Sequence, residues 1–236
     1  MKRYLIGNLI TEIEADCERL ARLGVPYETD RPGKADITVV LTDSQLKNLE
    51  QQYPTLSRDE LSYLATGSLF YRQLTLFDGM MLHSSAIAMD GAAYLFTAPS
   101  GTGKSTHTGL WRQVFGDRVE IINDDKPMIR KQDGIYRVFG TPWSGKTDLN
   151  QNISAPLKGI VFLSRGPGNT IRRANPSQDA VAPLFIEQTV RPRKPERMMA
   201  MLQTADEILT TVPLYFLQCN MDKQAALTAY EGLTRA

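Results

Sequence analysis

Cysteine is scarce in this sequence, with only Cys17 and Cys219 among 236 residues. The two lie far apart and fit no metal-ligand or redox spacing, which argues against a disulfide scaffold and a cysteine-based metal site. No apolar run reaches the roughly 20 residues that a membrane-spanning helix needs. The first apolar stretch is broken by acidic residues and is followed by no small-residue cleavage site. We therefore expect reduced thiols, no membrane partner and a cytoplasmic location.

The sequence also has almost no excess of charge of one sign: 27 Lys/Arg and 26 Asp/Glu give a net charge of +1. This balance gives no whole-protein argument for a nucleic-acid partner or an anionic membrane. The charge is nevertheless uneven. Residues 1–60 hold 8 basic and 11 acidic residues, a net of −3, whereas residues 158–197 hold 8 basic and 3 acidic residues, a net of +5. The second segment predicts a local anion site.

The composition, with 42% hydrophobic and 22% charged residues, is that of an ordinary globular protein. The length favours one elaborated domain with a small appendage. We expect residues 1–75 to form a small α+β cap, separate from or continuous with the main sheet, and residues 76–236 to form the core. In the cap, the pattern predicts strands over 4–13 and 37–41, then a short and a longer helix.

Two Asp-Gly pairs predict the architecture of the core. Asp90-Gly91 and Asp133-Gly134 each join two apolar runs, and such pairs favour tight turns between antiparallel strands. The expected strands are 81–89 with 92–98, and 127–131 with 135–139. Further along we expect strands 159–164 and 214–219, and helices 179–189, 195–211 and 223–233. The predicted fold class is therefore α/β with a mixed sheet flanked by helices, unlike a purely parallel dinucleotide-binding sheet.

The run Ala98-Pro99-Ser100-Gly101-Thr102-Gly103-Lys104-Ser105 lies between an apolar strand and a helix expected over 104–115. This context is typical of a P-loop, in which glycines let successive backbone N–H groups face a phosphate. The first position is Ala98, where the motif has glycine. Lys104 would neutralise phosphate oxygens and Ser105 would ligate Mg²⁺. The predicted nucleotide-binding residues are Ser100, Gly101, Thr102, Gly103, Lys104, Ser105 and Thr106.

Three further residues are expected near this loop. Asp124 and Asp125 follow the apolar run 119–122, and neighbouring side chains on a strand point to opposite sides, so we expect them to have different roles. One would hold Mg²⁺ and the other would face an acceptor hydroxyl. His83 lies seven residues before Asp90, and residue 98 lies seven after Gly91. Hairpin register therefore predicts His83 at the base of the loop.

These residues resemble the superfamily of HPr kinase/phosphorylase and ATP-dependent phosphoenolpyruvate carboxykinase. The resemblance covers about residues 80–165 and rests on Leu82-His83-Ser84-Ser85-Ala86, on the run from Tyr94 to Ser105, and on Ile122-Asn123-Asp124-Asp125. It implies a mixed-sheet P-loop core of that type. By likeness to the carboxykinases, His83 and Asp125 would be metal ligands. By likeness to the HPr kinases, Asp124 would be the base that takes the acceptor proton, although the two Asp roles are interchangeable at this stage.

Departures from both families limit what the resemblance implies. No Lys lies between Leu61 and Leu82, where carboxykinases need one, and a carboxykinase is more than twice as long as this sequence. A full HPr kinase carries a separate N-terminal domain and a signature after the loop, which the sequence does not match cleanly. The remaining likeness is to compact HPr-kinase-like kinases, whose loop is similar to residues 140–147. From it we expect substrate contacts by Trp143, Ser144 and Lys146. Arg165 is the candidate second cation on the transferring phosphoryl group, and Arg191 and Arg193, with Lys194 and Arg197, form a candidate acceptor-binding cluster.

The sequence thus predicts an ATP-dependent kinase that transfers the γ-phosphoryl group to a serine-type hydroxyl of a peptide, protein or small molecule. Its catalytic residues would be Asp124, Lys104, Arg165 and His83, its metal ligands Ser105, Asp125 and His83, and its cofactors ATP and Mg²⁺ or Mn²⁺. Two alternatives stay open: a nucleotide-binding regulatory module without an acceptor, and a bifunctional kinase/phosphorylase. The acceptor, the choice among ATP, GTP and pyrophosphate, and homo-oligomer formation are not predicted.

Overall fold

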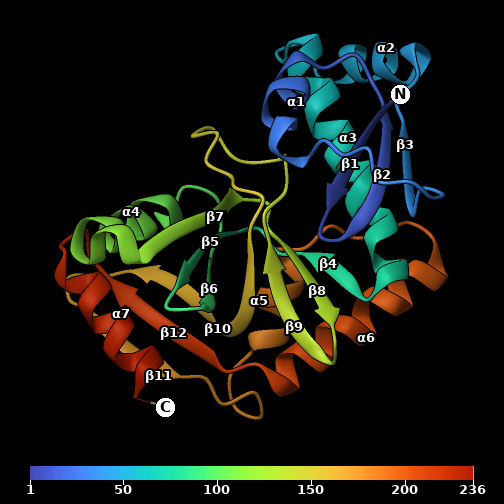
Figure 1. Ribbon diagram of the computed structural model, residues 1–236. Helices are drawn as coiled ribbons and strands as arrows, with labels where there is room; N and C mark the ends of the chain where they lie inside the picture. Colours follow the sequence, from blue (N-terminus) through green and yellow to red (C-terminus); the bar gives the residue numbers. More distant parts are fainter. Residues whose placement is uncertain (236) are drawn as a thin grey trace.

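The computed structural model describes residues 1–235 and contains two β-sheets (Figure 1). A three-stranded sheet of order β1-β2-β3 belongs to the N-terminal segment, and a nine-stranded sheet forms the main body. The larger sheet mixes parallel and antiparallel neighbours, and helices cover it. The prediction of a mixed α/β fold is therefore confirmed.

The N-terminal sheet is built from β1 (Lys2–Ile6), β2 (Leu9–Glu14) and β3 (Ile37–Val40), with helices α1 (Glu18–Leu23), α2 (Asp43–Gln52) and α3 (Arg58–Leu74) beside it. The prediction of one strand over residues 4–13 was wrong. Gly7 and Asn8 have φ of 56° and 64°, so the chain turns there and β1 pairs antiparallel with β2. The sequence pattern did not show this turn because the residues on both sides of it are apolar.

The main sheet has the order β4-β8-β9-β10-β6-β5-β7, and β12 pairs with β10 and β11. Its strands are β4 (Gly79–Met81), β5 (Ser84–Met89), β6 (Ala92–Thr97), β7 (Val119–Asp125), β8 (Met128–Gln132), β9 (Ile135–Phe139), β10 (Ser154–Arg165), β11 (Thr170–Arg173) and β12 (Leu214–Cys219). Both Asp-Gly hairpins are present, and all four turn residues have positive φ, as a type I′ turn requires.

Side chains along the central strands alternate between two hydrophobic cores. Ile87 and Phe96 pack on the side of α4 (Lys104–Phe115) and α7 (Gln224–Thr234), whereas Ala86 and Leu95 contribute to the core that includes residues of α5 (Val181–Glu187) and α6 (Pro195–Thr211). This period of two is what a sheet buried on both faces requires. Within residues 1–235 there are also three short 3₁₀ helices, at Val25–Tyr27, Thr75–Phe77 and Gly116–Arg118.

Two predicted elements differ from the structure in the main body. The strand expected over 81–89 is interrupted at Leu82 and His83, because Leu82 pairs with Thr189 and the His83 N–H donates to the Gln188 carbonyl at 2.7 Å. The residues after α5 therefore pair with Leu82 and His83, and the single strand that we expected is divided into β4 and β5. Strand β11, whose residues are mostly exposed, was not predicted because it lacks an apolar alternation.

A third core joins the N-terminal segment to the main sheet. It includes Phe70 and Tyr71 of α3, Met128 and Phe139 of the β8–β9 hairpin, and Trp143. In Figure 1 the N-terminal segment lies beside the end of the main sheet from which the long connection between β9 and β10 emerges. None of the helices described over residues 1–235 has the length and apolarity needed to span a bilayer.

Candidate active site

The loop between β6 and α4, residues 98–103, is shaped by two glycines. Gly101 and Gly103 have φ of 78° and 117°, in the left-handed region that side chains disfavour. A Cβ at either position would meet no atom within 4 Å, so the backbone angle and not lack of space requires glycine. Gly103 precedes α4 without a side-chain cap, which leaves N–H groups of its first turn free for an anion. We call residues 98–103 the glycine loop.

Lys104 begins α4 and folds back over the glycine loop. Its side chain is 8% exposed, and Nζ donates to the Ala98 carbonyl at 2.9 Å and to the Pro99 carbonyl at 3.5 Å. Burial lowers the pKa of Lys104, and the nearby Asp125 and Asp124 carboxylates oppose that shift. The ammonium thus lies between the loop and two acidic side chains. Ser100, Ser105 and Thr106 around it are exposed.

His83 lies next to Asp125 at the end of the β5–β6 hairpin, as its register predicted. Ser84 pairs with Thr97 on one side and with Asp125 on the other, and His83 Nε2 is 3.0 Å from Asp125 Oδ1. The other ring nitrogen, Nδ1, is 3.0 Å from Gln188 Oε1. Both ring nitrogens are therefore within hydrogen-bonding distance of polar side chains, and Nε2 is directed at the Asp125 carboxylate.

Asp125 is further held by the Lys126 ammonium, which contacts its other carboxylate oxygen. Burial alone would raise the pKa of Asp125, but the hydrogen bond from His83 and the charge of Lys126 outweigh it. Its pKa consequently lies well below the ordinary value. Asp125 is thus an anion at neutral pH and suited to binding cations.

Asp124 points to the other side of β7, as alternation along a strand requires. It is 5% exposed, and its two carboxylate oxygens accept hydrogen bonds from Ser85 Oγ at 2.6 Å and Thr147 Oγ1 at 2.7 Å. Ser85 Oγ is also 2.8 Å from Thr108 Oγ1 of α4. The carboxylate is therefore fixed between the sheet, α4 and the connection from β9 to β10.

The connection from β9 to β10 is hydrogen-bonded to the N-terminal segment. The Asp148 carboxylate accepts hydrogen bonds from Arg19 and Arg22 of α1, each at 2.6 Å, and Arg19 also donates to the Gly145 carbonyl. The position of Thr147 at Asp124 is thus set in part by α1, which approaches this connection in Figure 1. Sequence reasoning missed Thr147, Ser85 and Gln188 as site residues. The first two lie inside quoted motifs, whereas Gln188 carries no local signal.

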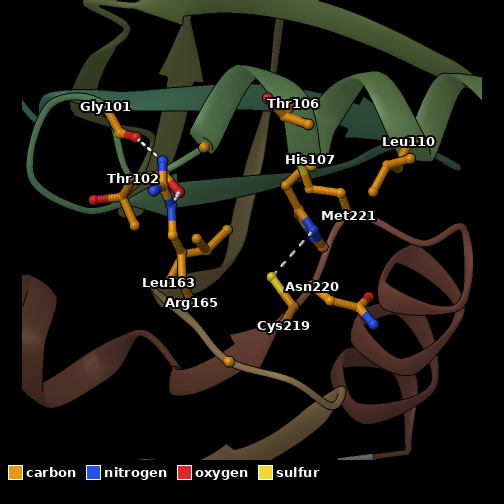
Figure 2. A pocket seen from close by; sticks show the side chains of 12 residues that line it. Gly101, Thr102, Thr106, His107, Leu110, Leu163, Arg165, Cys219, Asn220 and Met221 are labelled. Atoms are coloured by element: carbon orange, nitrogen blue, oxygen red, sulfur yellow. Dashed lines mark hydrogen bonds between the residues drawn. The ribbon is translucent and has the colours of Figure 1, made fainter.

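The remaining expected site residues are spread more widely. Arg165, at the end of β10, donates to the Thr102 carbonyl at 3.0 Å and also to the Gly101 carbonyl, so it contacts the glycine loop itself (Figure 2). Trp143 is 1% exposed and stacks on Phe70 with ring centroids 4.9 Å apart, which differs from the expected substrate contact. Ser144 is also buried, with its N–H bonded to Tyr63. Three candidates have exposed side chains: Lys146, Arg191 and Arg193.

His107 of α4, which we did not assign to the site, is a core residue. It is 2% exposed, Nε2 accepts a hydrogen bond from Trp111 Nε1 at 3.0 Å, and Nδ1 is 3.9 Å from Cys219 Sγ. Burial lowers the pKa of His107 from 6.5 to about 4. The folded protein therefore keeps this ring neutral.

This burial predicts a loss of stability on acidification. As the pH falls from 6.5 to about 4, the unfolded chain protonates His107 and the folded chain does not. The free energy of unfolding should fall by up to about 3 kcal/mol across this window from this residue. Urea titrations at pH 7 and pH 4.5 should show the loss in the wild type, and His107→Gln should lack that part of it. Equal losses in both proteins would contradict the assignment.

Comparison with known proteins gives a family match and similarities to solved structures. Residues 57–224 match the family described as "ScmC: SynChlorMet cassette protein ScmC". A solved structure with a distantly similar arrangement is the "Hpr(Ser) kinase/phosphatase from Coxiella burnetii", with 12% identity, a TM-score of 0.36, and coverage of 66% of this chain and 93% of that chain. No curated protein sequence matches. Because the family match extends over more than half of the 236 residues, the chain belongs to the family of the SynChlorMet cassette protein ScmC.

Proposed function

We propose that this protein is an ATP-dependent phosphotransferase that passes the γ-phosphoryl group to a serine-type hydroxyl of a peptide, a protein or a small molecule. The observation that carries the proposal is the convergence of Lys104, the His83–Asp125 pair and Asp124 at one end of the β5–β6 hairpin, beside the glycine loop. Phosphoryl transfer depends mainly on positioning and charge neutralisation, and this set of side chains supplies both.

The donor phosphates would lie on the glycine loop. Left-handed Gly101 and Gly103 and the uncapped first turn of α4 present backbone N–H groups, which favour an anion. Lys104 now bonds to loop carbonyls, and its ammonium would exchange these for phosphate oxygens. The sequence-derived nucleotide residues, from Ser100 to Thr106, are thereby proposed as the phosphate site, and the exposed Ser105 hydroxyl as an oxygen ligand for the accompanying cation.

The donor set fits a divalent cation that arrives with the nucleotide. Among residues 1–235, no group of three or more His, Cys, Asp and Glu side chains could hold a metal by itself. His83 Nε2 and Asp125 Oδ1 are 3.0 Å apart, which is about the separation of two adjacent ligands at roughly 2.1 Å from an octahedral ion. Mg²⁺ commonly takes one or two protein ligands together with phosphate oxygens, and an imidazole ligand also suits Mn²⁺. The ion would neutralise charge on the phosphates.

Asp124 would orient and deprotonate the acceptor hydroxyl. The Thr147 hydroxyl already donates to one of its oxygens, and this contact indicates a direction from which an acceptor hydroxyl can approach. The acceptor oxygen forms a bond to the γ-phosphorus while the bond to the β-phosphate oxygen breaks. The hydroxyl proton goes to Asp124, and ADP leaves. Arg165, fixed on the loop carbonyls, is proposed to shift onto the transferring group.

Exposed cations are proposed to recognise the acceptor. The segment that carries Arg191 and Arg193 follows Gln188, which bonds to His83 through both its carbonyl and its side chain. This connection ties the cationic segment to the site. Lys146 lies on the same connection as Thr147 and is also exposed. Residues 1–75 are proposed to act as a cap over this side of the site.

A second candidate function, a nucleotide-responsive module, is favoured by one observation. Arg19 and Arg22 of α1 hold Asp148, which follows the Asp124 partner Thr147. A nucleotide that displaces Asp124 would therefore disturb the contact with the N-terminal segment. Nucleotide-dependent protection of residues 1–75 from proteolysis, with ATP hydrolysis that needs no acceptor, would favour this function over transfer.

The test of the proposed function is incubation of the full chain with γ-labelled ATP, Mg²⁺ or Mn²⁺, and a panel of free serine, HPr and short serine peptides. We expect label on one acceptor class, dependent on the divalent cation. His83→Gln should change the preference between Mg²⁺ and Mn²⁺. Absence of binding of both ATP and inorganic triphosphate would overturn the proposal.

Thr147→Val is expected to lower the turnover number roughly tenfold, which corresponds to about 1.4 kcal/mol in the barrier. The variant removes the hydroxyl that fixes one oxygen of Asp124 and leaves the glycine loop unchanged. The dissociation constant for Mg·ATP should therefore stay the same. Thr147→Ser keeps the hydroxyl and should restore turnover. If valine and serine variants lose activity equally, Thr147 does not position Asp124 through its hydroxyl.

A further inference from the structure

We infer that a small apolar pocket between α3 and the main sheet binds an aliphatic side chain of a peptide acceptor, close to the serine that receives the phosphoryl group; this rests on the proposed function. The pocket has a volume of about 80 Å³. Pockets for whole small molecules typically measure roughly 300–1,000 Å³, and a cavity of about 150 Å³ holds one benzene molecule. The size of this pocket therefore suits a single side chain such as valine or leucine.

One wall of the pocket adjoins the pair formed by His83 and Asp125. The antiparallel β-bridge between β4 and β5 places His83 beside Gln188, as their hydrogen bonds show. On the other side of the same bridge, antiparallel register places Met81 beside Val190, and both residues line the pocket. Residues two apart on an extended chain lie roughly 7 Å from each other. The pocket is therefore about one such spacing from His83.

The connection from β9 to β10 brings the pocket close to the acidic pair as well. Trp143 of this connection closes the inner end of the pocket. Two residues later, a Cβ at Gly145 would lie 3.0 Å from the Asp124 carbonyl oxygen and 3.2 Å from Asp125 Cβ, so the backbone there lies directly on the acidic pair. Lys126 lines the pocket and contacts the Asp125 carboxylate with its ammonium. An extended peptide whose serine hydroxyl faces Asp124 would thus have a side chain within a few residues at the pocket.

The wall formed by α3 presents mainly apolar surface. Gly67 adds no side chain to it, and a Cβ there would lie 3.0 Å from the Trp143 ring. Leu64 also lines the pocket and is 46% exposed, so it has surface left for a ligand to cover. The hydroxyls of Tyr63 and Tyr71 donate to backbone carbonyls at 3.0 and 2.6 Å, which leaves their rings to face the pocket. This wall therefore favours an aliphatic group.

Basic residues beside the pocket indicate that the acceptor is a peptide that also carries an acidic residue. Arg191 directly follows Val190 of the pocket, and Arg191, Arg193 and Lys194 are exposed. A pocket for one aliphatic group next to exposed cations is complementary to a chain that offers an aliphatic and an acidic side chain together. Free serine offers neither. We expect valine, isoleucine or leucine within three residues of the acceptor serine.

The test is transfer of label from γ-labelled ATP, by the full chain, to a peptide library with a fixed central serine. Each of the three positions on either side is set in turn to leucine, valine, isoleucine or alanine, and the other positions are mixtures that include Asp and Glu. One missing methylene in an apolar pocket changes kcat/KM by about tenfold or more. We therefore expect the wild type to prefer an aliphatic residue over alanine at one position by at least about tenfold.

Two variants assign this preference to the pocket. Leu64→Ala removes apolar surface and should lower the preference at least about threefold. Leu202→Ala, which changes an exposed leucine of α6 outside the pocket, is the matched control and should leave the preference unchanged. Ser68→Leu adds a large side chain to the α3 wall and should abolish the preference, because the pocket is then filled.

The outcomes distinguish this inference from the proposed function, with the dissociation constant for Mg·ATP measured on the same samples. If the wild type labels peptides without an aliphatic preference, or if Leu64→Ala and Ser68→Leu both keep that preference, the inference is overturned and the transfer reaction stands. If the wild type binds Mg·ATP and labels none of the peptides, the pocket does not select a peptide acceptor and the inference is again overturned. If Mg·ATP is not bound either, the proposed function fails as well.

Discussion

Lys104→Ala is expected to reduce phosphoryl transfer by about a thousandfold or more, the scale on which a cation at a transferring phosphoryl group acts. Lys104 is the buried ammonium next to the glycine loop, and both Asp124 and Asp125 act on its pKa, so it lies where phosphate charge must be neutralised. The measurement is the rate of label transfer from γ-labelled ATP to the acceptor selected from the panel, with ATP and triphosphate affinities measured on the same sample.

The fold should survive this substitution. The Lys104 ammonium bonds to carbonyls of the glycine loop and not to the sheet or to another helix, so we expect the variant to keep a cooperative melting transition at neutral pH. Lys158→Ala, which removes an exposed lysine of β10, is the matched control and should leave transfer unchanged. Wild-type turnover in Lys104→Ala would show that the glycine loop does not hold the donor phosphates.

Elements with strong local signals were predictable from the sequence. Helix α6 and strand β12 have the expected bounds, and α4 begins at Lys104 directly after the glycines. The two Asp-Gly turns were predictable because positive φ at both central positions is a property of the turn itself. In each case, the residues that determine the element lie within it or adjacent to it.

Features that depend on distant partners were not predictable in this way. The break at His83 arises because Gln188, 105 residues further along the chain, accepts its N–H and contacts its ring. Trp143 was expected at the substrate, but the stacking partner Phe70 and the hydrogen-bond acceptor Thr66 belong to α3 and hold it in the core. A Gly/Pro-containing loop signals a connection and does not show which segment packs against it.

The candidate site was partly predictable because hairpin register is a local property. Counting outward from Asp90-Gly91 placed His83 near the loop, and the alternation of a strand separated Asp124 from Asp125. The contact between Arg165 and the glycine loop follows from the parallel pairing of β10 with β6. No local sequence pattern predicts that pairing. The roles of these residues in transfer remain predictions, which the variants test.

Asp124→Asn is the substitution expected to separate chemistry from binding most sharply. Removal of a general base typically costs about 10²–10⁴-fold in rate, and we expect a loss near 10³-fold here. The amide has the size of the carboxylate, so Ser85 can still donate to its oxygen, but the –NH₂ group cannot accept a hydrogen bond from Thr147. The measurement is single-turnover transfer from labelled ATP.

The dissociation constant for Mg·ATP is the control measurement for Asp124→Asn. Asp124 lies on the α4 side of β7, whereas the cation pair His83 and Asp125 lies on the other side, so Asp124→Asn should leave the Mg·ATP dissociation constant within about threefold of the wild type. Asp125→Asn should instead weaken Mg·ATP, because it removes a proposed cation ligand. If Asp124→Asn abolishes Mg·ATP binding and Asp125→Asn abolishes only transfer, the two carboxylates have exchanged roles. If Asp124→Asn keeps wild-type turnover, the acceptor proton leaves by another route and Asp124 serves only to join β7, α4 and the β9–β10 connection.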